Sequence, residues 1–184
     1  MKKSLMIIIT AAFLILALGI YYMANQNSGN SGTTVVLETN YGEITLQMYD
    51  DMPITTGNFV KLAHDGTYNG VIFHRVIDGF MIQGGDPTGT GYGDPKIPKI
   101  LDEFTHEGGN RNYRGTIAMA NAGSNTGSSQ FFINLIDNNF LDTKHPAFGE
   151  VINGMDVVDK IAKVQVGLND KPVSEVKIIK AKVL

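Results

Sequence analysis

Short segments of alternating apolar and polar residues, separated by turn residues, are the feature that most restricts what this chain can fold into. Residues 43–48 place every second, apolar side chain on one face, as a half-buried strand does. A second apolar segment, residues 35–38, precedes it across the turn-forming residues 40–42. The pattern therefore predicts that the fold opens with two antiparallel strands.

The same pattern recurs along the chain and is interrupted by only two helical segments. One helix should begin at Pro53 and end near Gly66, and the other should cover residues 155–163. Further strands are predicted at residues 71–77, 80–83, 116–121, 130–135, 148–152 and 173–184. Short strands without a βαβ rhythm indicate a mainly β fold, either a sandwich or a closed barrel with a helix at each end.

Length and composition exclude several classes of function. The chain has 184 residues, which suits one globular domain once a targeting segment and a tether are set aside. Its formal net charge of -3 comes from interspersed acids and bases, so nucleic-acid binding is not expected. Cysteine is absent, and the four histidines lack the spacing of a metal site, so we expect no metal and no cofactor.

The first 24 residues are interpreted as a targeting segment rather than part of the fold. Two lysines precede an uncharged apolar run from Leu5 to Ala24, which is long enough as a helix to cross a hydrocarbon layer of roughly 30 Å. The lysines should stay in the cytoplasm while the rest crosses. We expect an uncleaved membrane anchor with the following domain on the extracytoplasmic side, or a secreted domain if the segment is cleaved.

A flexible tether and one folded domain should follow this segment. Residues 25–34 are small and polar and show no apolar periodicity, which is typical of a linker. The domain is therefore predicted to cover residues 35–184. Within it, residues 84–98 are rich in glycine and proline and are read as a long ordered loop.

Two predicted strand regions carry an unusual mixture of side chains on one face. Side chains on a strand alternate between faces, so a cation, two amides and several large apolar groups should share a face. These residues are Arg75, Gln83, Gln130, Phe73, Met81 and Phe132. Such a face is typical of a pocket that binds a peptide with an apolar ring. Arg75 taken alone would be interpreted as an ordinary solvated residue.

Three stretches of sequence resemble the signature of the cyclophilin family. They are FHRVIDGFMIQGGD at residues 73–86, MANAGSNTGSSQFFI at 119–133 and LDTKHPAFGEV at 141–151, in the right order and at fitting separations. The resemblance covers nearly all of residues 35–184, and the compact loops look more like those of prokaryotic members. It implies a closed eight-stranded antiparallel β-barrel capped by two α-helices, with an active groove on the outside of the barrel.

The resemblance also implies roles for particular residues. The catalytic arginine falls on Arg75. The pocket for the proline ring falls on Phe80, Met81, Phe132 and Leu141, with His145 at its rim. The positions that hold the substrate backbone are Gln83, Ala120, Asn121 and Gln130. Phe140 stands where many eukaryotic members have tryptophan; it lacks the indole donor, so strong cyclosporin binding is in doubt while turnover should survive.

The activity that the resemblance implies is peptidyl-prolyl cis/trans isomerisation, acting without a cofactor on exported or cell-surface proteins to assist their folding. The partners would be proline-containing unfolded or extended polypeptides, and the enzyme should be a monomer. The alternative is a proline-peptide binding module that chaperones such chains with little turnover. Arg75 favours the enzyme, because binding alone would not require a cation that can donate to the prolyl nitrogen.

Overall fold

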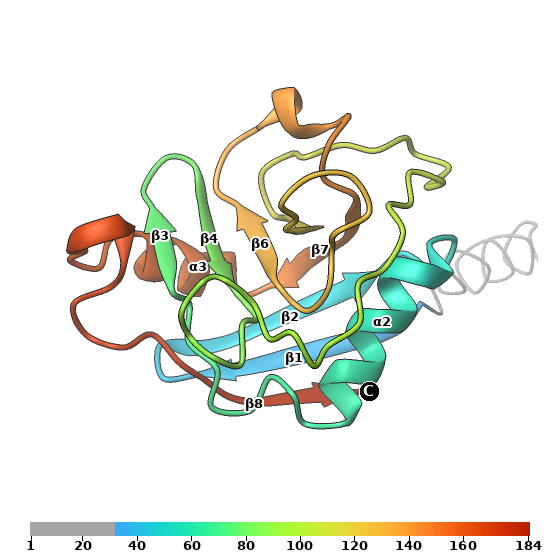
Figure 1. Ribbon diagram of the computed structural model, residues 1–184. Helices are drawn as coiled ribbons and strands as arrows, with labels where there is room; N and C mark the ends of the chain where they lie inside the picture. Colours follow the sequence, from blue (N-terminus) through green and yellow to red (C-terminus); the bar gives the residue numbers. More distant parts are fainter. Residues whose placement is uncertain (1–31) are drawn as a thin grey trace, which may run out of the picture. The chain divides into compact units, whose positions relative to one another are not determined.

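The computed structural model describes residues 32–184, so the predicted membrane segment at 1–24 lies outside the described residues. Eight strands form one antiparallel sheet in the order β3-β4-β6-β5-β7-β2-β1-β8 (Figure 1). Their bounds are β1 Thr34–Thr39, β2 Gly42–Met48, β3 Arg75–Ile77, β4 Met81–Gly84, β5 Thr116–Met119, β6 Phe131–Asn134, β7 Ala147–Asn153 and β8 Ile178–Val183. The helices are α2 Pro53–His64 and α3 Met155–Ala162, with a short 3-10 turn η1 Asn139–Leu141 and a tight turn η2 Leu168–Asp170.

The mainly β fold with eight antiparallel strands and two helices is confirmed, but the closed barrel is wrong. β3 and β8 end the strand order and do not pair as strands, so the sheet is an open half-barrel. Just before the two end strands, an isolated bridge between Ile72 and Lys177 and backbone hydrogen bonds between residues 70–73 and 176–178 join the two ends. The two end strands are too short to pair with each other as a ladder. β3 begins at Arg75 and β8 at Ile178, which is four and five residues later than the sequence pattern predicted.

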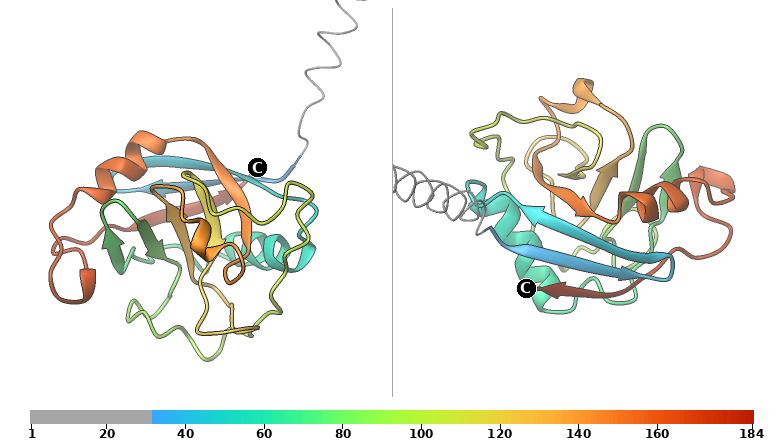
Figure 2. Two further views of the ribbon diagram at one scale, coloured as in Figure 1. Left: turned by 90° about the horizontal axis from the view of Figure 1, so that it is seen from above. Right: turned by 180° about the vertical axis from the view of Figure 1, so that it is seen from behind.

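The core lies on the concave side of the sheet and is rich in aromatic rings. Phe131 of β6 meets Phe59 of α2, Tyr68 and Phe73 edge-on, with ring centroids 5.4, 5.6 and 6.1 Å away. The edge-to-face arrangement is the one that ring quadrupoles favour. α2 packs beside β7 and β8, whereas α3 contacts β2, β3 and β4. The two helices lie on opposite sides of the domain (Figure 2).

The long segment between β4 and β5 is fastened to α2 by an acidic side chain. Met52, at the N-cap of α2, makes no side-chain hydrogen bond to the helix. The buried Glu103 carboxylate instead accepts from the amides of Ile54 and Thr55, at 3.2 and 2.8 Å. A carboxylate at this end satisfies free amides and also complements the helix dipole.

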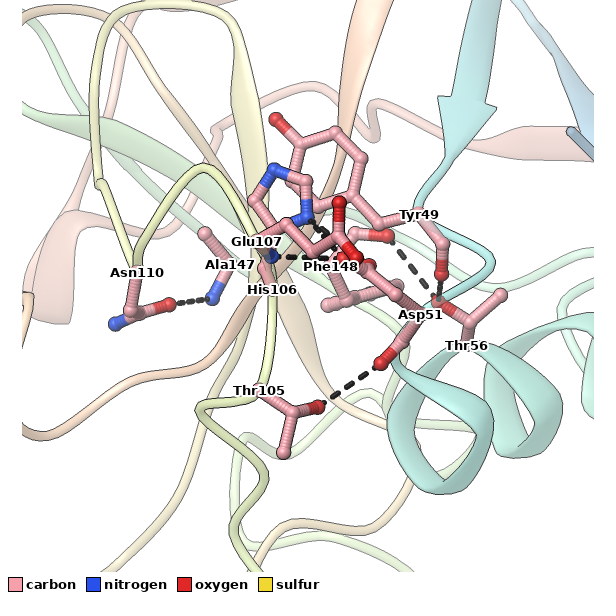
Figure 3. Close-up of polar contacts among 9 residues, drawn as sticks. All are labelled: Tyr49, Asp51, Thr56, Thr105, His106, Glu107, Asn110, Ala147 and Phe148. Carbon is pink, nitrogen blue, oxygen red and sulfur yellow. Dashed lines mark hydrogen bonds and ion pairs between the residues drawn. The ribbon is translucent and has the colours of Figure 1, made fainter. Parts of the chain in front are cut away.

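A second set of contacts lies just before α2, where Asp51 forms hydrogen bonds with the same long segment (Figure 3). Its carboxylate lies 3.0 Å from Nδ1 of His106 and accepts from the Glu107 amide at 2.8 Å. Burial alone would raise the pKa of Asp51, but these two hydrogen bonds outweigh it and lower the pKa. The His106 ring stacks on Tyr49 with centroids 3.8 Å apart, so ring stacking and a side-chain hydrogen bond hold one loop.

Neither helix within residues 32–184 has the length and apolar character needed to span a membrane.

Candidate active site

A cleft of about 310 Å³ opens on the face of the sheet that points away from the main core. Alternation along β4 explains this placement, because Met81 and Gln83 face the cleft while Ile82, between them, is fully buried in the main core. The cleft gathers nine of the eleven predicted site residues: Arg75, Phe80, Met81, Gln83, Ala120, Asn121, Phe132, Leu141 and His145.

The apolar part of the cleft is a small cluster of its own. Met81, Phe132 and Leu141 are all at least nine-tenths buried and pack with Ala118 and Ala147. The ring of His145 stands edge-on to Phe132, with centroids 5.4 Å apart. A shallow apolar pocket with a few polar groups at its rim suits a small ring that carries a peptide backbone.

Arg75 lies on the wall of this cleft and is less than half exposed. It stands opposite Gln83 in the antiparallel register of β3 and β4. Its Nε donates to Oδ2 of Asp170 at 3.3 Å. In the described part of the chain, no hydrogen bond or ion pair joins its two terminal nitrogens to another residue, so these four N–H donors can meet a ligand.

Two glutamine amides form a chain beside the cleft. Gln83 Nε2 donates to Oε1 of Gln130 at 2.9 Å, and Gln130 Nε2 donates to the carbonyl of Gly91 at 3.0 Å. These contacts orient both amide groups. Gln130 itself lines a neighbouring hollow, which shares Gln83, Ala120 and Asn121 with the cleft.

Phe140 and His145 take different places at the rim. Phe140 is 66% exposed and stacks on Phe80 at 6.0 Å, outside the residues that line the cleft. Nδ1 of His145 lies 3.0 Å from the carbonyl oxygen of Met119. Because a carbonyl only accepts, we assign the proton to Nδ1, which leaves Nε2 free for other contacts.

A buried ladder of asparagines, absent from the predicted site residues, lies behind the cleft. Asn134 donates to Asn112 at 3.2 Å, and Asn138 donates to Oδ1 of Asn134 at 2.8 Å and to the carbonyl of Phe80 at 3.0 Å. All three asparagines are essentially inaccessible to water. Asn112 also donates to the carbonyl of His145 at 3.1 Å, so the ladder fixes two rim residues. No local sequence pattern marks these asparagines as buried.

Asp86 also supports the site from outside the predicted site residues. It is fully buried, and its carboxylate accepts from the Thr88 hydroxyl and from the amides of Thr88, Gly91 and Gly93. Burial alone would raise the pKa of Asp86, but these hydrogen bonds outweigh it and lower the pKa. Because the Gly91 carbonyl holds Gln130, Asp86 fixes the amide chain through the loop.

Comparison with known proteins gives consistent results. The family model described as cyclophilin type peptidyl-prolyl cis-trans isomerase/CLD matches residues 34–183. The protein named peptidyl-prolyl cis-trans isomerase-like 1 from Aspergillus fumigatus is 48% identical, and the match covers 83% of this chain and 96% of the relative. The protein of the same name from Homo sapiens is 47% identical, and the match covers 80% of this chain and 90% of the relative. A Cryptosporidium parvum cyclophilin type isomerase has a TM-score of 0.77 at 33% identity, covering 83% of this chain and 97% of its own.

The same Cryptosporidium parvum protein has also been solved in the presence of the dipeptide Ala-Pro, and this structure matches with a TM-score of 0.76 at 33% identity, over 82% of this chain and 98% of that one. The relatives named here are eukaryotic, so the likeness to prokaryotic members stays a prediction.

The predicted localisation, a domain anchored at the outer face of a membrane, is wrong by these comparisons. The Aspergillus fumigatus relative is matched over 96% of its length, which leaves it little chain for a counterpart of residues 1–24. Those residues lie outside the described part of this chain, and no helix in the described part could span a membrane. Membrane association and exported or cell-surface substrates depended on this location, and none of these findings supports them.

Proposed function

Since this chain belongs to the cyclophilin-type peptidyl-prolyl cis-trans isomerase family and is an enzyme of that kind, we propose that it rotates Xaa-Pro bonds in the cleft beside Arg75. The proposed substrates are proline-containing unfolded or extended polypeptides, whose folding this rotation assists. The isomerase domain is proposed to be residues 35–184. One observation carries the proposal: a guanidinium whose terminal nitrogens have no partner within residues 32–184 stands on the wall of an apolar cleft that suits a proline ring.

The physical problem is the barrier to rotation about the amide bond, which is roughly 18–20 kcal/mol because nitrogen shares its lone pair with the carbonyl. In the twisted transition state the prolyl nitrogen becomes pyramidal and regains that lone pair. Arg75 is always protonated, so it can donate to this nitrogen, which in the planar ground state accepts poorly. An interaction made mainly in the transition state lowers the barrier and raises the rate.

The other residues hold the substrate while the bond turns. Met81, Phe132 and Leu141 grip the ring by apolar contact, and Gln83 and Asn121 bind the flanking backbone. Rotation then takes place about a fixed axis, in a partly dry cleft where the field of the guanidinium is stronger than in water. No covalent bond forms or breaks, so the reaction needs neither a nucleophile nor a proton acceptor. The Ala-Pro dipeptide used with the Cryptosporidium parvum relative supports a proline-containing ligand.

The test compares Arg75→Ala with the parent chain in two measurements. We expect the catalysed exchange of a Xaa-Pro peptide to fall by about 10²- to 10³-fold, the range found when one transition-state donor is removed. Peptide affinity should change only a few-fold, because Phe80, Met81 and Phe132 still form the pocket. Equal losses of affinity and turnover would contradict the proposed mechanism and favour a binding module.

A further inference from the structure

A tight hairpin follows α3 and brings an acidic side chain to Arg75. The Gly167 amide donates to the carbonyl of Lys171 at 2.8 Å, and the Lys171 amide donates to the carbonyl of Leu168 at 3.3 Å. Between them, Asn169 (φ 57°, ψ 33°) and Asp170 (φ 59°) are both left-handed. This is the conformation of a type I′ turn, whose two central positions favour asparagine, aspartate and glycine. The sequence Asn-Asp therefore specifies the turn locally.

The turn aims the Asp170 carboxylate at one particular nitrogen of Arg75. Oδ2 lies 3.3 Å from Nε, and the two side chains are 44% and 42% exposed. An ion pair this exposed contributes little to folding stability. Its geometry has a different consequence: a guanidinium is planar and rigid, so a contact at Nε restricts the plane and direction of the whole group. The terminal nitrogens are then directed elsewhere.

We propose that Asp170 is a positioning residue for isomerisation, which holds the Arg75 guanidinium so that its terminal nitrogens face the prolyl nitrogen. This inference rests on the proposed function of Arg75 and deepens it. An arginine side chain has many rotamers, and the substrate can use only those that point into the cleft. Restricting them before the substrate arrives raises the fraction of bound complexes that are ready to rotate.

The negative charge of Asp170 also acts in the opposite direction, because it weakens the positive field of Arg75. Two observations indicate that positioning outweighs this effect. Both side chains are nearly half exposed, so water screens the carboxylate. The contact is made at Nε, so among the described residues the terminal nitrogens keep their donors for a ligand. The hydrogen bond that orients the guanidinium is a direct contact, whereas the weakening of its field acts over a longer distance, where water and salt screen it more.

The test uses two glycine substitutions that both preserve the turn. Asp170→Gly keeps a residue that accepts positive φ and removes the carboxylate, while Asn169→Gly removes the neighbouring side chain, which makes no hydrogen bond to Arg75 among the described residues. In the full chain, we expect Asp170→Gly to slow exchange of saturating Xaa-Pro peptide by about three- to five-fold, the upper range for a half-exposed pair. Peptide affinity should stay within about two-fold, and Asn169→Gly should match the parent.

A spectroscopic signal separates positioning from a general effect on the loop. The Nε–H resonance of Arg75 should exchange slowly with water in the parent chain and in Asn169→Gly, and rapidly in Asp170→Gly. Asp170→Asn should recover part of the lost rate, since an amide oxygen still accepts from Nε. An unchanged rate or a faster rate in Asp170→Gly, or equal losses in the two glycine variants, would overturn the inference.

Arg75→Ala distinguishes a failure of this inference from a failure of the proposed function. If Arg75→Ala abolishes turnover and Asp170→Gly does not change it, only the positioning role of Asp170 fails. If Arg75→Ala retains full turnover, the proposed function fails, and the positioning role fails with it.

Discussion

Asn138 and Asn139 are neighbours in the chain, yet the structure gives them opposite environments. Asn138 is 1% exposed and donates both to Asn134 and to the carbonyl of Phe80, whereas the side chain of Asn139 is exposed at the start of η1. A buried polar network is strong only while each member is satisfied. Phe80 and the apolar pocket therefore depend on an amide that a substrate need not touch.

This contrast gives a paired prediction. Asn138→Leu should lower the free energy of unfolding by about 1–3 kcal/mol, because Oδ1 of Asn134 loses its donor inside the protein. Asn139→Leu should change it by less than about 0.5 kcal/mol. Urea unfolding of both variants followed by fluorescence measures the difference, and equal effects would show that the asparagine ladder is not stabilising.

At the scale of single residues, strand alternation predicted part of the set of side chains that share the cleft. Met81, Gln83 and Phe132 lie there with Arg75, whereas Phe73, which was predicted on the same face, lies in the main core. The partners of those residues were not predictable in the same way. Asn134, Asn138 and Asp86 act through contacts across the fold, and an isolated polar residue in a sequence does not reveal whether it will be buried.

Among the elements, α2 depends on a residue far away in the chain. Its local sequence provides proline at the first turn but no capping side chain, and Glu103 supplies the missing acceptor from the long loop. The amides of Ile54 and Thr55 would otherwise be unsatisfied beside the core. The helix and the loop therefore stabilise one another.

Removing that carboxylate should destabilise both elements together. We expect Glu103→Ala to lower the free energy of unfolding by about 1–2 kcal/mol and Glu103→Gln by less, since the amide oxygen still accepts but the charge at the helix terminus is gone. Glu107→Gln is the matched control, because only the backbone amide of Glu107 contacts Asp51. Hydrogen exchange of the α2 amides measures the effect, and equal protection in Glu103→Ala and Glu107→Gln would refute the capping role.

The elements also show why some bounds were predicted and others were not. The hairpin of β1 and β2 and both helices follow local patterns, and their bounds agree with the sequence within a few residues. β3 and β8 were predicted too long, because the apolar residues 71–73 and the two valines within 173–177 extend the strand pattern beyond the regular ladder. Strand pairing between distant segments decides where such strands begin, and one sequence does not encode that pairing visibly.

For the whole molecule, acidity should be a sensitive variable. Asp51 and Asp86 both have a pKa lowered in the folded state by hydrogen bonds that outweigh burial. A group with a lowered folded pKa stabilises the fold fully above its unfolded pKa, near 4, and loses that contribution as the pH falls through the folded value. The contribution of these two carboxylates should therefore be level near neutrality and fall below about pH 4.

Asp86→Asn tests this dependence. At pH 7 the variant should be less stable by about 1–3 kcal/mol, because an amide replaces a carboxylate that accepts several hydrogen bonds. Below about pH 4 the gap between variant and parent should narrow, since the parent progressively loses the contribution of its carboxylate as Asp86 takes up a proton. Urea unfolding at a series of pH values measures both curves, and a gap that stays constant with pH would contradict the assignment.

The sheet order has one more consequence, which concerns the two ends of the domain. β1 lies next to β8, and the amide of Leu184 donates to the carbonyl of Thr34 at 2.9 Å. The chain thus enters and leaves the domain at a single point. A short peptide could join these ends in a circularly permuted protein, with new ends opened in an exposed turn, and the order of synthesis would change while every neighbour in the sheet stayed the same.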